Sequence, residues 1–290
     1  MITAAQEEYI ERYAYVPEHI PQYVTPISQT EPHLFGEFLV YAKKDHFILV
    51  GYPLNESFEE KRLERALEDA VKRLKPVSVS LIAPAIPPSL QQGPHPPTDH
   101  YYRLDLSTIS LPQKLRNMLR RAGRELSVGK NPRFDQEHKK MVEEFLKSHS
   151  ADEATRFIFQ RIDTYLSSSK TASIFEARTG DGDLVAFDVA ELKPRDYAVY
   201  MFNFRSESRY IPGASDLLLS AVMQQAITEG KKYINLGLGI NPGVTFFKEK
   251  WGGVVFLPHA FCLYHPTRKG LLCYLPRSEG VYRERICVVF

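Results

Sequence analysis

The chain has 290 residues, of which 43% are hydrophobic and 25% are charged, and its formal net charge is +2. This balance is typical of a globular protein with a substantial core, organised as one large or two modest domains. The small net charge excludes a protein that is basic over its whole surface, so any anion-binding surface must be local. No apolar run approaches the ~20 residues that span a bilayer, and we expect no membrane span.

Features that indicate the cellular compartment are few. The first residues lack the basic and apolar regions of a signal peptide. Three cysteines, Cys262, Cys273 and Cys287, lie in apolar surroundings without CxxC spacing, and we interpret them as reduced thiols. No Cys or His pair has ligand spacing, so no metal site is expected. These features predict a cytoplasmic protein.

The first third of the chain has the pattern of a compact α/β unit. An irregular lead-in is expected over residues 1–33, followed by a hairpin, a helix that begins with a capping-box sequence, and a strand. These elements are Phe35–Ala42, His46–Tyr52, the helix that begins near Ser57–Glu60 and ends before Pro76, and Val77–Ile82. Six prolines between Pro84 and Pro97 then indicate a loop or linker.

The remainder of the chain alternates between helical and strand periods. The expected order is strand, basic helix, two amphipathic helices, a three-stranded meander, helix, strand, short helix and two strand-like runs. These elements are Tyr101–Leu106, residues 114–124, Gln136–Lys147, Asp152–Ser167, Ala172–Arg178, Leu184–Leu192, Tyr197–Phe204, Ser215–Glu229, Tyr233–Leu238, residues 244–251, Val254–Leu257 and Phe261–Tyr264. The strands Tyr197–Phe204 and Tyr233–Leu238 are expected to be parallel neighbours joined by a right-handed helical crossover.

The stretch Asn241–Gly253 contains the most informative motif. It resembles the strand-loop-helix element that closes the acyl-donor cleft of GNAT N-acyltransferases, with Lys248 where a Tyr is usual. The matching positions are Asn241, Val244, Phe247, Lys250 and Gly252. The Phe-Lys pair resembles the Fem family of peptidoglycan aminoacyltransferases and, more loosely, the catalytic domain of bacterial lysyl-phosphatidylglycerol synthases. The resemblance implies an α/β (α+β) fold with a GNAT-like mixed sheet flanked by helices, and a smaller GNAT-like unit over residues 1–105 in tandem with a larger one over 106–290.

The resemblance also implies an activity. It predicts a bacterial-type acyltransferase that moves an acyl or aminoacyl group from acyl-CoA or aminoacyl-tRNA to an amine-bearing acceptor, with no tightly bound cofactor. A coenzyme A thioester suits the GNAT order of elements, whereas aminoacyl-tRNA suits Pro212 and Lys248 and would make tRNA a partner. A further alternative is a non-catalytic GNAT-like module that binds a peptide, a nucleotide or RNA.

A donor-binding turn is expected where the meander leads into the long helix. GNAT enzymes hold the pyrophosphate of coenzyme A on the N–H groups that open this helix. Pro212 replaces a Gly of the family turn and has no N–H to donate. The residues assigned to donor binding are Arg209, Gly213, Ala214, Ser215 and Asn241. The alternative is a tight turn in which Ser215 or Asp216 caps the helix.

Three residues are candidates for catalysis, namely Lys248, Asp188 and Tyr200. By resemblance, the Lys248 ammonium stabilises an oxyanion or a phosphate, and the alternative is a solvated helix lysine. Asp188 is a candidate general base, with an exposed strand residue as the alternative. Tyr200 and Asn203 lie on the strand that frames the acyl cleft in GNAT folds, and with Phe247 they are candidates to hold the acyl group or the acceptor. Lys250 is expected to face away from the cleft.

A basic stripe occupies one face of the helix predicted over residues 114–124. Arg116, Arg120 and Arg124 recur at i, i+4 and i+8, with Lys114 and Arg121 nearby. A polyanionic substrate such as tRNA or a nucleotide-linked acceptor would be attracted to it, with salt-dependent affinity. The alternative is a solvated helix face.

Overall fold

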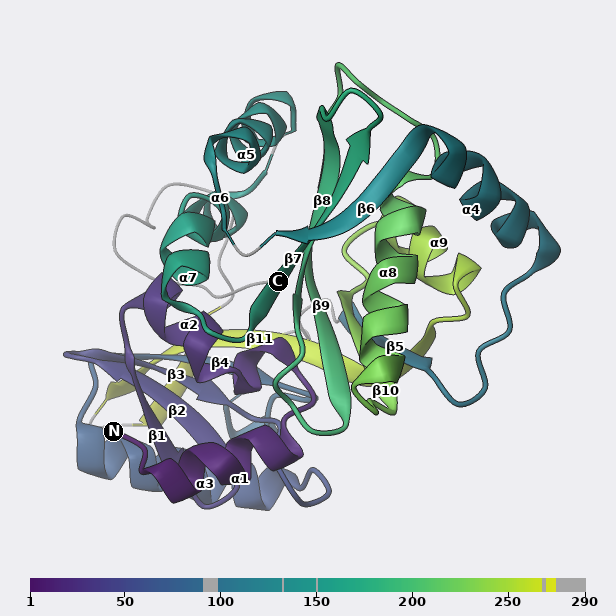
Figure 1. The fold of residues 1–290 in the computed structure, drawn as a ribbon. Helices are drawn as coiled ribbons and strands as arrows, with labels where there is room; N and C mark the ends of the chain where they lie inside the picture. The colour runs from purple at the N-terminus through teal and green to yellow at the C-terminus, as the bar shows by residue number, and fades with distance from the viewer. Residues whose placement is uncertain (91–98, 132, 150, 268–269, 275–290) are drawn as a thin grey trace.

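One mixed sheet of twelve strands organises the computed structural model, which describes the chain except residues 91–98, 132, 150, 268–269 and 275–290 (Figure 1). The strand order is β1-β2-β3-β4-β11-β5-β10-β9-β8-β7-β6, and β12 pairs with β11. The strands are β1 (Glu31–Phe35), β2 (Phe38–Lys43), β3 (His46–Val50), β4 (Ser78–Ala83), β5 (Asp99–Asp105), β6 (Leu126–Asn131), β7 (Ala172–Thr179), β8 (Leu184–Glu191), β9 (Tyr197–Arg205), β10 (Tyr233–Leu238), β11 (Val254–Thr267) and β12 (Gly270–Tyr274).

Helices cover both faces of the sheet. They are α1 (Ala4–Tyr13), α2 (Pro21–Ser28), α3 (Glu60–Leu74), α4 (Gln113–Glu125), α5 (Gln136–Ser148), α6 (Glu153–Phe159), α7 (Ile162–Ser168), α8 (Ala214–Thr228) and α9 (Pro242–Lys250). Figure 1 shows α4, α8 and α9 on one side of β6–β10 and α5–α7 on the other. The alternation of β8 matches these two layers, because Ala186 and Ala190 join the core under α8 while Phe187 and Val189 join the opposite core.

The long strand β11 connects the first and last parts of the chain. Its first half pairs with β5, and its second half pairs with β4. Strand β5 in turn pairs with β10. The sheet therefore continues across residue 105, and the division into units 1–105 and 106–290 stays a prediction.

Several expected elements are confirmed and others are corrected. The predicted parallel pairing of β9 with β10 is present. The prediction of an irregular lead-in was wrong, because residues 1–33 contain the helices α1 and α2. A capping box formed by Thr3 and Gln6 satisfies the first amides of α1. Strand β6 was not predicted, since its polar side chains lie at the sheet edge. The helix predicted over Asp152–Ser167 is divided into α6 and α7.

Two smaller expectations also change. The two predicted runs Val254–Leu257 and Phe261–Tyr264 are parts of the single strand β11. Cys262 is disulfide-bonded, so the interpretation of this residue as a reduced thiol was wrong. No helix in the described residues is long and apolar enough to cross a membrane.

Candidate active site

The two central parallel strands separate near their C-terminal ends. Strand β10 pairs with β9 only over Tyr233–Asn235, whereas its pairing with β5 on the other edge continues, after a register shift, to Leu238. Gly237 lies between Asn235 and Leu238 with a φ of +78°, a conformation that favours glycine. A Cβ added at Gly237 would lie 3.7 Å from Lys248 Nζ and 4.0 Å from the carbonyl oxygen of Tyr200. The Lys248 ammonium therefore lies at the point where the strands separate.

Lys248 is a buried lysine without an ion-pair partner among the described residues. Its side chain on α9 is 4% exposed, and Nζ donates to the carbonyl oxygen of Leu238. The ammonium lies 5.7 Å from the ring centroid of Tyr102. Burial lowers the pKa of Lys248 to about 7, and the charge of Asp99 opposes this shift. The residue therefore changes charge near neutral pH.

The loop before α9 is held so that this lysine points at the strands. Asp99 accepts from the backbone N–H groups of Gly239 and Ile240 at 3.0 and 2.8 Å. Asn241 caps α9 by accepting from the Val244 N–H at 3.0 Å. The donor-binding role expected for Asn241 stays a prediction.

A second buried group lies on β8 and β9, on the sheet face that α8 covers. Asp188 is fully buried, so the expectation of an exposed strand residue was wrong. Asn203 donates to Asp188 Oδ1 at 2.5 Å, and Ser215 donates to Asn203 Oδ1 at 3.0 Å. Burial raises the pKa of Asp188 to about 8 although Asn203 and Tyr200 oppose the shift. The structure thus brings together four residues that the sequence analysis assigned to separate roles.

The Tyr200 hydroxyl and Asp188 Oδ2 are the polar atoms of this group that stay unsatisfied. Neither has an aligned hydrogen-bond partner among the described residues. Burial raises the pKa of Tyr200 well above its usual value, and the nearby Asp188 raises it further. Two buried polar atoms without partners cost free energy unless another group occupies the site.

The turn before α8 is built on Gly213. This residue is the N-cap, with a φ of +87°, so the alternative in which Ser215 or Asp216 caps the helix was wrong. A Cβ at Gly213 would lie 3.1 Å from Met118 Cγ and 3.2 Å from Ala122 Cβ. Glycine is required both by the backbone conformation and by the close approach of α4. The Ala214 amide donates to the carbonyl oxygen of Ile211 at 3.3 Å, whereas the next two amides of α8, those of Ser215 and Asp216, have no intrahelical acceptor and are available to an anion.

Asp216 connects the start of α8 to the end of α9. Its Oδ1 accepts from Trp251 Nε1 at 2.8 Å and lies 2.6 Å from Lys250 Nζ. The expectation that Lys250 faces away from the site was therefore wrong. The contact between Trp251 and Asp216 could not be predicted, because no local pattern links residues 35 positions apart.

The other candidates lie at the margin of the site. Arg209 forms an exposed ion pair with Asp183 at 2.6 Å, and Ala214 is buried in the first turn of α8. Phe247 is half-buried against the core under α8. The structure thus places these residues around the site, and their roles in binding stay predictions.

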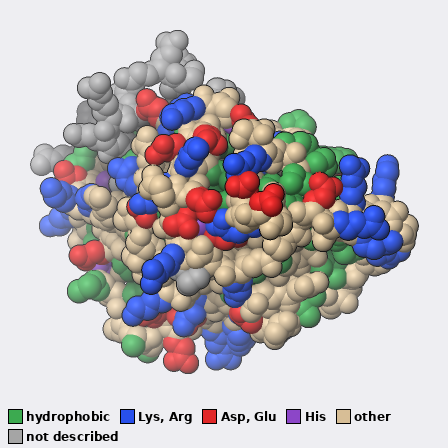
Figure 2. Space-filling view, turned by 45° about the horizontal axis from the view of Figure 1, so that its top comes forward, with side chains coloured by type: hydrophobic (Ala, Val, Ile, Leu, Met, Phe, Trp, Pro, Cys, Tyr) green, Lys and Arg blue, Asp and Glu red, His purple; other side chains and the backbone are tan. Residues whose placement is uncertain are grey.

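Helix α4 presents its basic stripe to solvent. Arg116 donates to the carbonyl oxygen of Leu111 at 3.0 Å, and Arg120 donates to Asn117 at 2.8 Å. Arg124 is exposed in the last turn. No ion pair to a basic residue of α4 is present among the described residues. Figure 2 shows Lys and Arg side chains gathered at the edge of the molecule that α4 forms.

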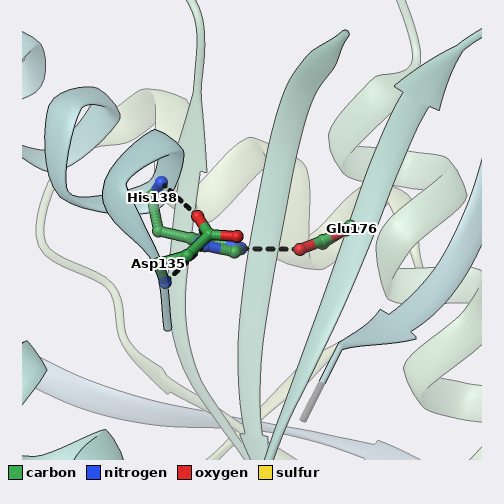
Figure 3. A group of neighbouring side chains, drawn as sticks. All are labelled: Asp135, His138 and Glu176. Atoms are coloured by element: carbon green, nitrogen blue, oxygen red, sulfur yellow. Dashed lines mark hydrogen bonds and ion pairs between the residues drawn. The ribbon is translucent and has the colours of Figure 1, made fainter. Parts of the chain in front are cut away.

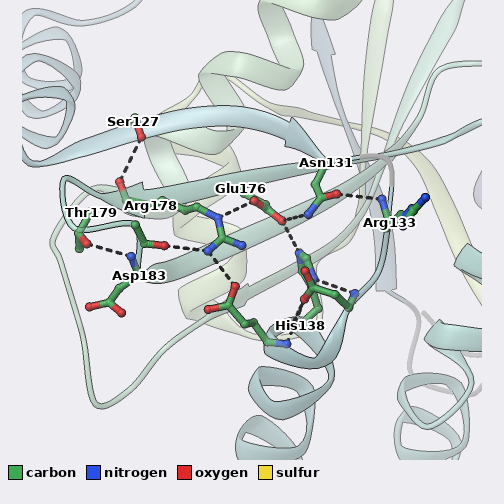
Figure 4. Close-up of polar contacts among 11 residues, drawn as sticks. Ser127, Asn131, Arg133, His138, Glu176, Arg178, Thr179 and Asp183 are labelled. Carbon is green, nitrogen blue, oxygen red and sulfur yellow. Dashed lines mark hydrogen bonds and ion pairs between the residues drawn. The ribbon is translucent and has the colours of Figure 1, made fainter.

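A third polar cluster lies on the opposite face of the sheet, and the sequence analysis did not identify it. His138 on α5 is fully buried, with Nδ1 at 2.7 Å from Asp135 Oδ1 (Figure 3). Its Nε2 lies 2.9 Å from Glu176 Oε1, without the alignment of a good hydrogen bond. Glu176 also accepts from Arg178 Nε at 2.7 Å and Asn131 Nδ2 at 2.5 Å (Figure 4).

The donor atoms of Asp135, His138 and Glu176 lie within 4.8 Å of one another, as in a metal site. The two carboxylates, however, face opposite nitrogens of the same ring, and Arg178 already neutralises Glu176. This geometry fits a network of ion pairs better than a set of metal ligands.

The fold is similar to that of several transferases. No protein-family model and no curated protein matches the chain. Among solved structures it resembles the C-terminal DUF2156 domain of a provisionally named lysylphosphatidylglycerol synthetase from Agrobacterium fabrum, with 15% identity, TM-score 0.59 and coverage of 90% of this chain and 91% of that one. It also resembles FemX, with 10% identity, TM-score 0.60 and coverage of 89% and 96%.

A GCN5-related N-acetyltransferase from Kribbella flavida is similar as well, with 13% identity, TM-score 0.51 and coverage of 84% and 93%. At these identities the similarities show the fold and not the activity. The chain has the GNAT-like fold, with a mixed sheet flanked by helices, that the sequence motif predicted.

Proposed function

We propose that this protein is an acyltransferase that moves an acyl or aminoacyl group from an activated donor directly to an amine. The observation that carries the proposal is the separation of β9 from β10 with the buried Lys248 ammonium at the point of divergence. Strand backbones that separate in this way expose N–H and C=O groups to a ligand, which can pair with them as another strand would.

Lys248 has the properties of an oxyanion stabiliser. Transfer requires the amine to attack the donor carbonyl, and negative charge then develops on the carbonyl oxygen. A buried ammonium stabilises this charge more strongly than a solvated one because little water screens it. The pKa of about 7 would rise as the charge develops nearby, so the charged form of Lys248 is favoured when it is needed.

Asp188 is the candidate to receive the proton that the amine loses, whereas Tyr200, whose pKa is raised well above its usual value, keeps its proton and can donate a hydrogen bond. A general base works best when its pKa lies near the working pH, and the pKa of Asp188 is about 8. The unsatisfied Asp188 Oδ2 and Tyr200 hydroxyl would gain partners from a bound acceptor. The side chains of Asn203 and Ser215 hold Asp188 in position through the chain of hydrogen bonds described above.

The turn at Gly213 is the proposed site for phosphates of the donor. The amides of Ser215 and Asp216 in the first turn of α8, together with the helix dipole, suit a phosphate group. The α4 stripe adds positive charge near this turn, whereas the charge of Arg209 is compensated by Asp183. The donor is either a coenzyme A thioester or an aminoacyl-tRNA, and the exposed stripe favours the larger polyanion.

The test compares the buried Lys248 with the half-buried Lys231. Like Lys248, Lys231 donates to a backbone carbonyl, that of Pro194 at 2.8 Å, and burial lowers its pKa, but it lies before β10, away from the separated ends. In single-turnover assays with acyl-CoA and aminoacyl-tRNA donors, Lys248→Met is expected to lose about 100-fold or more in rate. Lys231→Met should stay close to wild type.

Equal rates in the two variants would remove Lys248 from the chemistry. A wild-type protein that binds donors but transfers nothing would favour the alternative of a non-catalytic binding module. Pro212 is the observation that favours this alternative, because it removes one N–H from the phosphate turn.

A further inference from the structure

A cavity that opens to solvent lies on the sheet face opposite the proposed active site. It has a volume of about 500 Å³ and is lined by the end of α1, the loop before α3 and the strands β5, β9 and β11. On β5, Tyr102 packs in the core under α8, whereas Tyr101 packs in the opposite core. Arg103 is on the same face as Tyr101 and lines the cavity. This volume is in the range of small-molecule sites.

Arg103 is a cation without a carboxylate partner in the described part of the chain. Its Nη1 donates to the Tyr197 hydroxyl at 3.1 Å, while Nε is buried without a partner. The guanidinium lies over the rings of Tyr233 and Phe256, at 4.3 and 5.2 Å from their centroids. Aromatic stacking fixes its orientation, and the unsatisfied N–H group is available to an acceptor.

The charges of the cavity wall are unevenly compensated. The two carboxylates of the wall are already paired with cations, Glu56 with Arg62 and Asp196 with Arg195 and Lys232. The two arginines of the wall, Arg12 and Arg103, form no ion pair within the described residues. The wall therefore holds two cations without a carboxylate partner, and an anionic ligand would supply one.

Aromatic rings form much of the remaining wall. The aromatic residues that line the cavity are Tyr13, Tyr15, Phe58, Tyr197 and Phe256. Tyr197 and Phe256 stack with centroids 6.3 Å apart and 25° between their planes. Flat rings at these positions offer faces and edges to another flat ring.

We propose that this cavity binds a small organic anion in which a carboxylate or phosphate is joined to a flat ring. Arg103, with Arg12 at the rim, binds the anionic group, and the aromatic wall binds the ring. The site is separate from the active site proposed above and does not depend on it. Arg103 lies beside the start of β9 and β10, whereas Lys248 lies at their separated ends.

The experiment measures binding of 2-naphthoate and 2-naphthyl phosphate to the full chain by fluorescence titration and ligand-detected NMR. The uncharged 2-naphthol tests the need for the anion, and cyclohexanecarboxylate tests the need for a flat ring. We expect saturable binding of a charged naphthyl compound that is at least 10-fold tighter than that of either control probe. The preferred anion tells a carboxylate site from a phosphate site.

Variants assign this binding to the cavity. Loss of a hydrogen bond to a charged group corresponds to about 10- to 100-fold in affinity, so Arg103→Leu should weaken binding by this factor. Arg161→Leu is the matched control, because Arg161 lies over the Phe157 ring at 3.5 Å but outside the cavity wall. Ser57→Trp fills the rim from an exposed position and should block binding while both arginines remain.

Thermal unfolding of each variant separates lost binding from lost folding. If Arg103→Leu does not fold, Ser57→Trp alone decides the matter. The proposal is overturned by absence of saturable binding of both naphthyl anions. It is also overturned by equal affinity for 2-naphthol, or by unchanged affinity in both Arg103→Leu and Ser57→Trp.

Discussion

Two groups of buried ionisable side chains lie on opposite faces of the same sheet, and they differ in how their charges are compensated. On the face under α5, both nitrogens of His138 face carboxylates, and Glu176 is further paired with Arg178. On the face under α8, Asp188 and Lys248 are buried without an ion-pair partner in the described residues, and burial moves the pKa of each toward neutrality.

The difference distinguishes a structural role from a functional one. Burial alone would raise the pKa of Glu176, but its bonds to Arg178 and Asn131 outweigh burial and lower it. Charges compensated in this way hold helix α5 on the sheet. Charges left uncompensated carry a cost in free energy, and such groups gather where a substrate completes the site. The comparison therefore supports the α8 face as the site of chemistry.

The largest expected effect comes from a substitution in the compensated cluster around His138. Glu176→Gln keeps the shape of the side chain but removes its charge, and loss of one partner from a buried ion-pair network costs about 3–5 kcal/mol. Urea unfolding at pH 7 measures this loss. Glu144→Gln, in the exposed pair with Lys140, should change stability by less than about 0.5 kcal/mol. Similar values for both would show that the cluster is not structural.

Asp188→Asn tests the uncompensated acid. The folded pKa is about 8 against a usual value of 3.8. Stability from the retained proton is fully present below pH 3.8 and is lost as the pH rises through 8. Wild-type stability should therefore fall over this interval, and that of the variant should not. We expect the variant to be more stable by several kcal/mol at pH 8. Parallel pH profiles would contradict the burial of a titrating carboxyl.

Packing between elements that are distant in the chain explains what could not be predicted from the sequence. Alternation along β8 groups Asp188 with Ala186 and Ala190, but the sequence does not show which face a helix covers. The alternative of an exposed Asp188 was wrong because α8 packs over this face. The His138 cluster joins two elements that are about forty residues apart, and only the fold brings them together.

Elements with a strong local period were predicted well. The three-stranded meander and the α8 crossover each depend on neighbouring residues. Strand β6 carries few apolar residues and is specified by pairing with β7. Helix α1 packs through Ile10, and α2 packs through residues such as Tyr23 and Ile27. The hydrophobic period of each helix is therefore short and weak.

Lys248→Met tests the uncompensated base and should give a change of opposite pH dependence. The folded pKa is about 7 against 10.5 in a solvated lysine. Below pH 7 the folded protein must bury the charge, and this cost disappears as the pH approaches 10.5 because the unfolded state then loses its proton too. The variant should gain about 2 kcal/mol below pH 7 and little near pH 10.5. Exposed Lys140→Met should show no such trend, and a flat difference for Lys248 would place its ammonium in water.

The α4 stripe is the third case, in which charges are uncompensated but exposed. Replacing Arg116, Arg120 and Arg124 with Ala should change stability by less than about 0.5 kcal/mol per site, because water already screens these charges. Binding of tRNA should instead weaken, and the slope of log affinity against log salt should flatten by up to about one unit for each phosphate that the variant no longer binds. Filter binding between low and moderate salt measures this slope.

Replacing Lys61, Arg65 and Lys72 of α3, a helix that covers the other end of the sheet, provides a matched control with the same change in net charge. If the two triple variants bind with the same slope, the stripe attracts polyanions only through net charge and is not part of the donor site.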